Sequence, residues 1–198
     1  MTSMRSDHVW MRHTIWFLPV ALVACGRAPE SGSSSLATPV YNEETGRLEQ
    51  IVSDRDGDGR VETRAFMDGT RLVRIEIDRD GDEKVDRWEY YISGGEPAVP
   101  VMERAEEAGG PEGVITRRER YADGTLERVE DDTNLDGRAD KWETYQEGRL
   151  VSVDLDLVGR GTPNRRLVYG TDGTITRMES DADGDGIFEA LPAPGGAR

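Results

Sequence analysis

One short acidic motif recurs along this 198-residue chain at a nearly constant spacing. The aspartates that open it stand at positions 54, 78, 132, 156 and 181, so successive copies are 24 or 25 residues apart, except for one gap of 54. Before the motif runs a longer unit, Gly-x-Leu-x-x-Val-x-x-Asp, and in two copies an aromatic segment follows it. A fixed period of this size indicates tandem units, each too small to bury its own hydrophobic face. The repeats must therefore pack against one another.

Within each unit, the residue pattern predicts β-hairpins. Val73, Ile75 and Ile77 alternate with Arg74 and Glu76, a period of two that is typical of a strand with one solvated face. Asp-Gly or Glu-Gly pairs separate such segments, and Asp-Gly is a strong hairpin signal. We therefore predict an all-β fold: an antiparallel β-meander of about ten strands over residues 41–191, with tight turns on one edge and the acidic loops on the other.

Two features of the array bear on where it could contact a ligand. The long gap contains what we predict to be a loop insertion at 93–113, bounded by glycine and proline. We favour disorder for it, and the alternative is one or two helical turns over 101–108; elaborated loops in regular arrays often carry binding specificity. Trp88 and Trp142 share one repeat position. We expect core or cross-strand partners there, in preference to a ligand platform.

Four of the five motifs carry oxygen side chains at alternate positions, as a cation-binding loop does. They read DRDGDGRVE, DRDGDEKVD, DTNLDGRAD and DADGDGIFE, with oxygens at positions 1, 3, 5 and 9. Calcium prefers about six to eight oxygens, and glycine permits the sharp bend around the ion. We therefore predict Ca²⁺ as the cofactor. The predicted ligands are Asp54, Asp56, Asp58, Arg60, Glu62, Asp78, Asp80, Asp82, Lys84, Asp86, Glu89, Asp132, Asn134, Asp136, Arg138, Asp140, Glu143, Asp181, Asp183, Asp185, Ile187 and Glu189, of which Arg60, Lys84, Arg138 and Ile187 would use backbone carbonyls.

The fifth motif is an exception. It runs DLVGRGTPN from Asp156 and puts Val158 and Arg160 where ligands should be. Arg160 would place a positive charge where the ion would sit. We predict that this loop binds no ion and serves as a structural turn.

The acidic loops resemble those of the EF-hand, the thrombospondin type 3 repeat and the FG-GAP β-hairpin, over nine to twelve residues at a time. The loop from Asp132 matches the EF-hand pattern in full, with Glu143 at position 12. Helices should flank an EF-hand loop, whereas hairpin signals surround every copy here, so the FG-GAP pattern, closed at position 9, fits better. The turn-and-tyrosine half of the unit is similar to MORN-variant repeats of bacterial surface proteins.

The N-terminus predicts export. Residues 1–24 have the basic start and the apolar run of a signal peptide, and that run is too short to span a bilayer as a helix. It ends in Leu-Val-Ala-Cys, which resembles the bacterial lipobox and implies lipidation of Cys25. The alternative is an ordinary signal in which Cys25 is incidental. By the same resemblance, Gly26 favours the outer membrane. Residues 25–40 are predicted to be a flexible tether and residues 192–198 a disordered tail.

Composition excludes several classes of function. The formal net charge is −15, and an acidic surface repels nucleic acid and attracts cations. Both histidines, His8 and His13, lie in the signal, and Cys25 is the single cysteine. Ser-His-Asp and Cys-His catalysis and Cys/His zinc sites are therefore excluded for the mature chain.

Three classes remain. The leading hypothesis is a calcium-binding, membrane-anchored lipoprotein that acts as a structural or binding module at the bacterial envelope, with an unknown envelope protein or polysaccharide as partner. An alternative is a periplasmic assembly or immunity-type lipoprotein whose metal loops are only struts. An enzyme is not expected. The enzyme considered is a glycoside hydrolase with paired carboxylates, but nearly every clustered carboxylate already has a ligand role.

Overall fold

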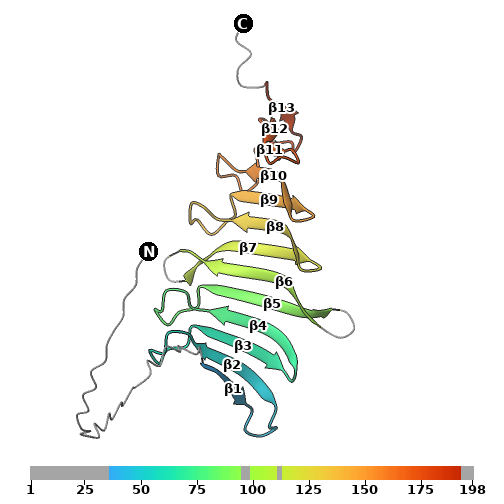
Figure 1. Ribbon diagram of the computed structural model, residues 1–198. Coiled ribbons are helices and arrows are strands. Elements are labelled where there is room, and N and C mark those ends of the chain that lie inside the picture. The colour runs from blue at the N-terminus through green and yellow to red at the C-terminus, as the bar shows by residue number, and fades with distance from the viewer. Residues whose placement is uncertain (1–35, 95–98, 111–112, 193–198) are drawn as a thin grey trace, which may run out of the picture. The chain divides into compact units, whose positions relative to one another are not determined.

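The strands pair in the order in which they occur along the chain. The structure, a computed structural model, describes residues 36–94, 99–110 and 113–192, and these form one antiparallel 13-stranded sheet that is not closed (Figure 1). The predicted all-β meander is confirmed, with more strands than expected. The strands are β1 (Leu36–Tyr41), β2 (Leu48–Asp54), β3 (Thr63–Asp68), β4 (Arg71–Ile77), β5 (Arg87–Gly94), β6 (Val99–Ala108), β7 (Ile115–Ala122), β8 (Thr125–Asp131), β9 (Lys141–Gln146), β10 (Arg149–Leu155), β11 (Arg165–Tyr169), β12 (Ile175–Ser180) and β13 (Glu189–Ala190).

The two edges of the sheet reverse the chain in different ways. On one edge, β7 and β8 are joined by Asp123-Gly124 and β9 and β10 by Glu147-Gly148. All four of these residues have a positive φ, between 48° and 76°. Positive φ at both central residues defines the type I′ turn, whose twist matches the flanking strands. The acidic loops lie on the opposite edge (Figure 1), as predicted.

The buried core is one row of residues across the middle of the sheet. Ala105 and Val129 have an exposed fraction of 0%, and Val153 of 6%. In the strand register, Glu119 lies between Ala105 and Val129, and Glu143 lies between Val129 and Val153. Directly opposed residues have Cβ atoms about 4.5–5.5 Å apart, so each glutamate packs between two small hydrophobic side chains. The sheet thus buries a few small hydrophobic side chains within a single layer.

The carboxylates of that row belong to a triplet that recurs on alternate strands. In each triplet the tyrosine hydroxyl donates to the glutamate, at 2.7–2.8 Å, and the basic residue pairs with it, at 2.6–2.9 Å. Glu107 and Asp131, from the strands between, extend the pairing into a continuous network. We call this network the ionic ladder and its side of the sheet the ladder face. The triplets are Arg87–Glu89–Tyr91, Arg117–Glu119–Tyr121 and Lys141–Glu143–Tyr145.

Two predictions of irregular structure were wrong. Val99–Ala108 is neither disordered nor helical but forms β6, which pairs with β5 and β7. Its alanines and glutamates favour helix locally, yet pairing on both sides and burial of Ala105 override that preference. Leu36–Tyr41 forms β1, so the tether cannot extend to residue 40. The gap of 54 residues therefore contains an additional hairpin, whose connection on the loop edge, 109–114, lacks the acidic motif.

The other predictions about the chain ends fall outside the described residues. The signal at 1–24, Cys25, the tether up to residue 35 and the tail from residue 193 are among them. Within the described part of the chain, no helix has the length and apolarity needed to cross a bilayer.

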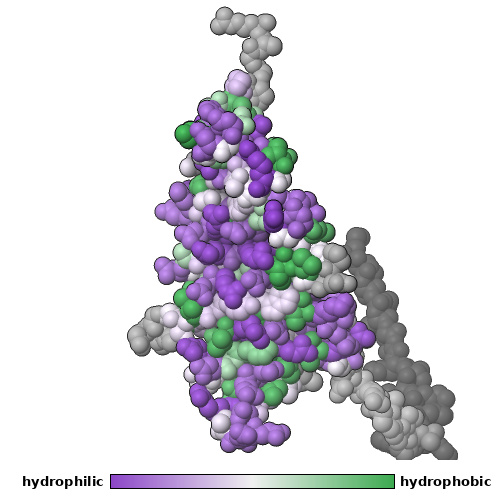
Figure 2. All heavy atoms as spheres, turned by 180° about the vertical axis from the view of Figure 1, so that it is seen from behind, coloured by the Kyte–Doolittle hydropathy of each residue, from purple (hydrophilic) through white to green (hydrophobic). Residues whose placement is uncertain are grey.

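Opposite the ladder face lies a second face. Because side chains alternate along a strand, Trp88 and Trp142 lie on it, half-buried, each between carboxylates of the neighbouring strands. They are thus cross-strand partners, which is one of the two roles that the sequence analysis expected for them. Figure 2 shows one side of the molecule as largely hydrophilic, with hydrophobic side chains in small separate groups.

Candidate metal centres on the loop edge

The first aspartate of each acidic loop holds the loop in shape. Asp54 accepts hydrogen bonds from the N–H groups of Gly57, at 2.6 Å, and Gly59, at 2.9 Å. Asp78, Asp132 and Asp181 each accept two backbone N–H groups of their own loops as well, and they are 4–5% exposed. A carboxylate buried to this degree needs such partners. Position 1 therefore serves the turn whether or not an ion is bound.

The ninth residue closes the loop from the other end. Glu62 accepts the N–H of Arg55 at 2.6 Å, and the corresponding bonds of Asp86 and Asp140 measure 2.6 and 3.1 Å. In the loop without ligands, Asn164 makes the same contact at 2.8 Å. An amide thus substitutes for the carboxylate there, which shows that this position also has a structural role.

Positions 3 and 5 differ from those two. Each accepts the N–H two residues further on, as Asp56 does from Asp58 at 3.2 Å and Asp58 from Arg60 at 2.8 Å. Arg60, Lys84, Arg138 and Ile187 are all placed by this last contact. The contact uses one carboxylate oxygen and leaves the other available. Positions 3 and 5 are also the ones lost in the loop from Asp156, so they best separate an ion site from a simple turn.

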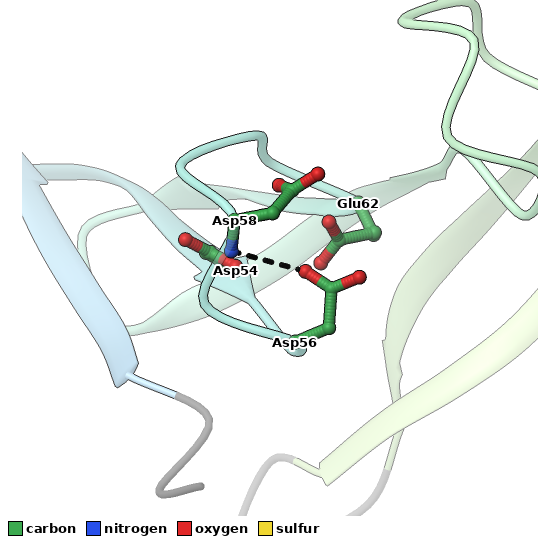
Figure 3. Close-up of side chains that lie close together, drawn as sticks. All are labelled: Asp54, Asp56, Asp58 and Glu62. Carbon is green, nitrogen blue, oxygen red and sulfur yellow. Dashed lines mark hydrogen bonds between the residues drawn. The ribbon is translucent and has the colours of Figure 1, made fainter.

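The first loop gathers the most complete set of oxygens. Asp54, Asp56, Asp58 and Glu62 each offer one oxygen, and these atoms all lie within 4.8 Å of one another (Figure 3). Two oxygens on one calcium ion are at most about 5 Å apart, because each lies about 2.3–2.6 Å from it. The set therefore fits a single coordination sphere. Figure 3 shows the four side chains pointing toward a common space.

Two further loops bring three carboxylates together within the same limit. One set comes from the second loop and the other from the last loop, between β12 and β13. In the second loop Asp82 is not part of the set, because its carboxylate pairs with Lys84 at 3.0 Å, and this hydrogen bond lowers the pKa of Asp82. The sets are Asp78, Asp80 and Asp86, and Asp181, Asp183 and Asp185.

The loop that matched the EF-hand pattern in full is not the best-formed one. Asp140 takes hydrogen bonds from the Thr133 hydroxyl at 2.7 Å and from backbone N–H groups, and no carboxylate set forms in this loop among the described residues. Leu135 there has a φ of 63°, the left-handed conformation that the other loops give to glycine. Full agreement with the EF-hand pattern therefore did not predict which carboxylates converge.

Three predicted ligands lie on the strands that follow the acidic loops. Glu89 and Glu143, at position 12, are on β5 and β9, where they bond to Arg87 and Lys141 of the ionic ladder. Glu189 is on β13, paired with β12. Position 12 of the second and third loops thus lies in the sheet, because strands and not helices follow these loops, and the assignment of these three residues as ligands stays a prediction. The recurring Arg/Lys-x-Glu-x-Tyr triplet was the sequence signal for this place in the sheet.

Arginine side chains connect neighbouring loops. Arg60 Nη1 donates to the carbonyl of Gly81 in the next loop at 2.8 Å. Arg160 reaches from its own loop to the carbonyl of Asp181 at 3.3 Å. The prediction that the loop from Asp156 binds no ion is untested and stays a prediction. Its turn is intact, with Asp156 accepting the N–H of Gly161 at 2.5 Å.

Comparison with known proteins gives no further constraint, since no family model, no curated protein and no solved structure matches this chain.

Proposed function

We propose that this chain is a calcium-binding lipoprotein of the bacterial envelope, and that its loops stabilise a repeat sheet that serves as a structural or binding module. The observation that carries the proposal is the first loop, where four carboxylate oxygens lie within 4.8 Å of one another. Without a cation, four charges this close repel each other. Two further sets of three repeat the arrangement along one edge, in a chain of net charge −15.

Calcium suits these sets better than magnesium. The donors are carboxylates on irregular loops, and calcium tolerates variable oxygen geometry, whereas magnesium demands a near-octahedral site and gives up its water reluctantly. Extracellular calcium modules bind at roughly 10⁻⁴–10⁻³ M. Ion binding to the folded state alone would then raise the free energy of unfolding by about 2.7 kcal/mol per site at 100 Kd.

Calorimetric titration and thermal unfolding of the full mature chain test this proposal. Calcium should bind with a stoichiometry of at least three and raise Tm, and EDTA should reverse the shift. The double variant Asp56→Asn/Asp58→Asn should lose one equivalent. A matched control, Asp68→Asn/Asp123→Asn, removes two charges on the turn edge and should keep every equivalent. Unchanged Tm and circular dichroism on adding EDTA to the calcium-loaded protein would contradict the proposal.

Anchoring and location need separate experiments. Labelled palmitate should be incorporated into the wild-type chain in bacteria and not into Cys25→Ser. The proposal leaves two orientations of the module: on the cell surface, or in the periplasm with the loops acting as struts. Protease added to intact cells should cleave a surface protein and spare a periplasmic one.

A further inference from the structure

The second face of β6, β7 and β8 carries four arginines in two neighbouring rows. The register places Arg104, Arg120 and Arg128 directly opposite one another across the three strands. The next row places Arg118 between two glutamates of the flanking strands. Four arginines against two glutamates leave an excess of positive charge here, in a chain whose net charge is −15. We call these six residues the arginine patch.

The excess charge resides on β7. On β6, Arg104 pairs with Glu106 of its own strand at 2.9 Å, and the equivalent pair on β8 measures 3.0 Å. On β7 the corresponding positions are both arginine, Arg118 and Arg120, and both are exposed. Neither has a carboxylate within 4.0 Å among the residues that the structure describes. Two guanidinium groups are therefore available to an external partner.

The row of Arg104, Arg120 and Arg128 is itself unfavourable for the sheet. Like charges directly opposite one another on neighbouring strands are destabilising. A hollow of about 170 Å³ lies among these side chains and is lined by Arg104, Arg118, Arg120 and Arg128, together with Ala105, Glu106, Glu119 and Glu130. Guanidinium groups bind carboxylate, sulfate and phosphate through paired hydrogen bonds. An anion bound in the hollow would offset the repulsion among Arg104, Arg120 and Arg128 by its attraction to all three.

The electrostatic surroundings support an anion at this place. The connection at 109–114, between β6 and β7, is the one that lacks the acidic motif. Arg128 is four residues from Asp132, or about 14 Å along an extended strand, which exceeds the screening length of about 8 Å at physiological ionic strength. A bound anion would therefore experience the arginines more strongly than the acidic loops.

Aromatic side chains extend the patch sideways. In the row of Arg118, Trp88 on β5 and Trp142 on β9 come next on either side. They lie four strands apart, about 19 Å at ordinary strand spacing. The Arg104 guanidinium lies over the ring of Tyr90, 3.4 Å from its centroid. Aromatic rings offer flat apolar contact beside the charges. A ligand that reaches both tryptophans passes Glu106 and Glu130 on either side of Arg118, so it is an extended chain with apolar ring faces and with anionic groups spaced apart.

We propose that this face binds a linear polysaccharide bearing carboxylate or sulfate groups, with Arg118 and Arg120 as the principal anion contacts. The proposal does not depend on calcium occupancy of the loops. A nucleic acid duplex is the less suitable polyanion, because its dense charge would meet the acidic edge of the sheet as well as the patch.

Binding of the calcium-loaded full chain to defined polymers tests the proposal. The probes are hyaluronate as the carboxylate source, dextran sulfate as the sulfate source, and neutral dextran. Saturable binding to at least one anionic polymer is expected, with weaker binding at high salt. Arg118→Gln/Arg120→Gln should weaken that binding about tenfold or more. The matched control Arg71→Gln/Arg149→Gln removes two arginines on the turn edge and should bind within about twofold of wild type.

A stability measurement separates a binding role from a structural one. Because Arg120 stands between two arginines, the single variant Arg120→Gln relieves repulsion, and its Tm should equal or exceed that of the wild type. Equal binding by the two double variants overturns the proposal, as does equal binding of dextran. DNA bound as tightly as the glycans, or inorganic sulfate that displaces them at equal anion concentration, overturns the polysaccharide assignment. Glycan binding without any effect of calcium on stability would refute the calcium proposal and leave this one standing.

Discussion

Replacing Arg87 by methionine removes a guanidinium from the ionic ladder while keeping an unbranched side chain. Arg87 donates to Glu89 at 2.8 Å and to Glu119 at 2.9 Å, and it also pairs with Glu107. Its side chain is 10% exposed and those of its partners are 10–24% exposed. Removing one partner of a buried ion pair costs about 3–5 kcal/mol, because the remaining charges stay buried without compensation.

The expected change in thermal stability is large. At about 2–4 °C per kcal/mol for a domain of this size, Arg87→Met should lower Tm by roughly 6–20 °C. Arg149→Met is the matched control, since its pair with Glu147 is 60% and 85% exposed and contributes at most about 1 kcal/mol. Circular dichroism on both variants, with calcium present, makes the comparison. Equal losses in the two variants would refute the stabilising role of the ladder.

The pH dependence gives a second test of the same reasoning. Burial alone would raise the pKa of Glu119, but hydrogen bonds from Arg117, Arg87 and Tyr121 outweigh it and hold the pKa below its usual value. Stability from this group is therefore fully present above the ordinary carboxyl pKa of about 4.3, and it is lost as the pH falls through the lower folded-state value. The gap between wild type and Arg87→Met should be widest above about pH 5 and should narrow below pH 4. A gap that stays constant down to acid pH would contradict this account.

Three other predictions concern the core, a tyrosine and the loop without ligands. Val129→Ala should cost about 2 kcal/mol in urea unfolding, while Val73→Ala, at a 39% exposed position, should cost less than about 0.5. Burial and then the hydrogen bond to Glu143 raise the pKa of Tyr145 to about 12, so ultraviolet titration should show ionisation near that pH, and stability should fall as the pH rises above about 10, where the unfolded chain ionises first. Asp156→Ala should lose about 1–3 kcal/mol and leave the calcium stoichiometry unchanged; a lost equivalent would show that this loop binds an ion after all.

The sequence predicts the repeating part of this fold well, because each hairpin is specified locally. Alternation over residues such as Val73 and Ile75, and the Asp-Gly pairs, depend only on neighbours in the chain. Strand β6 was not predicted, because its residues favour helix and only its pairing with β5 and β7 makes it a strand. Strand β1 escaped because its segment follows a Gly- and Ser-rich stretch.

For the candidate sites, the sequence predicts which loops are acidic but not which oxygens converge. Asp82 and Lys84 are two residues apart, and only the structure shows that they pair with each other. Glu89 and Glu143 have the spacing of position 12 in a helical loop, and in this chain that position lies on a strand. Such assignments depend on whether a strand or a helix comes after the loop, and a nine-residue pattern does not contain that information.

Because the strands pair in sequential order, the place of each strand in the sheet follows its place in the chain. Each strand adds about 4.8 Å, so the 13 strands place β1 and β13 roughly 58 Å apart. Position along the chain thus translates directly into height along the sheet. Most contacts run between neighbouring strands, so insertion or deletion of a whole hairpin changes this height by about 10 Å and repacks mainly the strands next to the change. In a chain held at one end, the number of repeats alone would therefore set how far the other end of the sheet lies from the point of attachment.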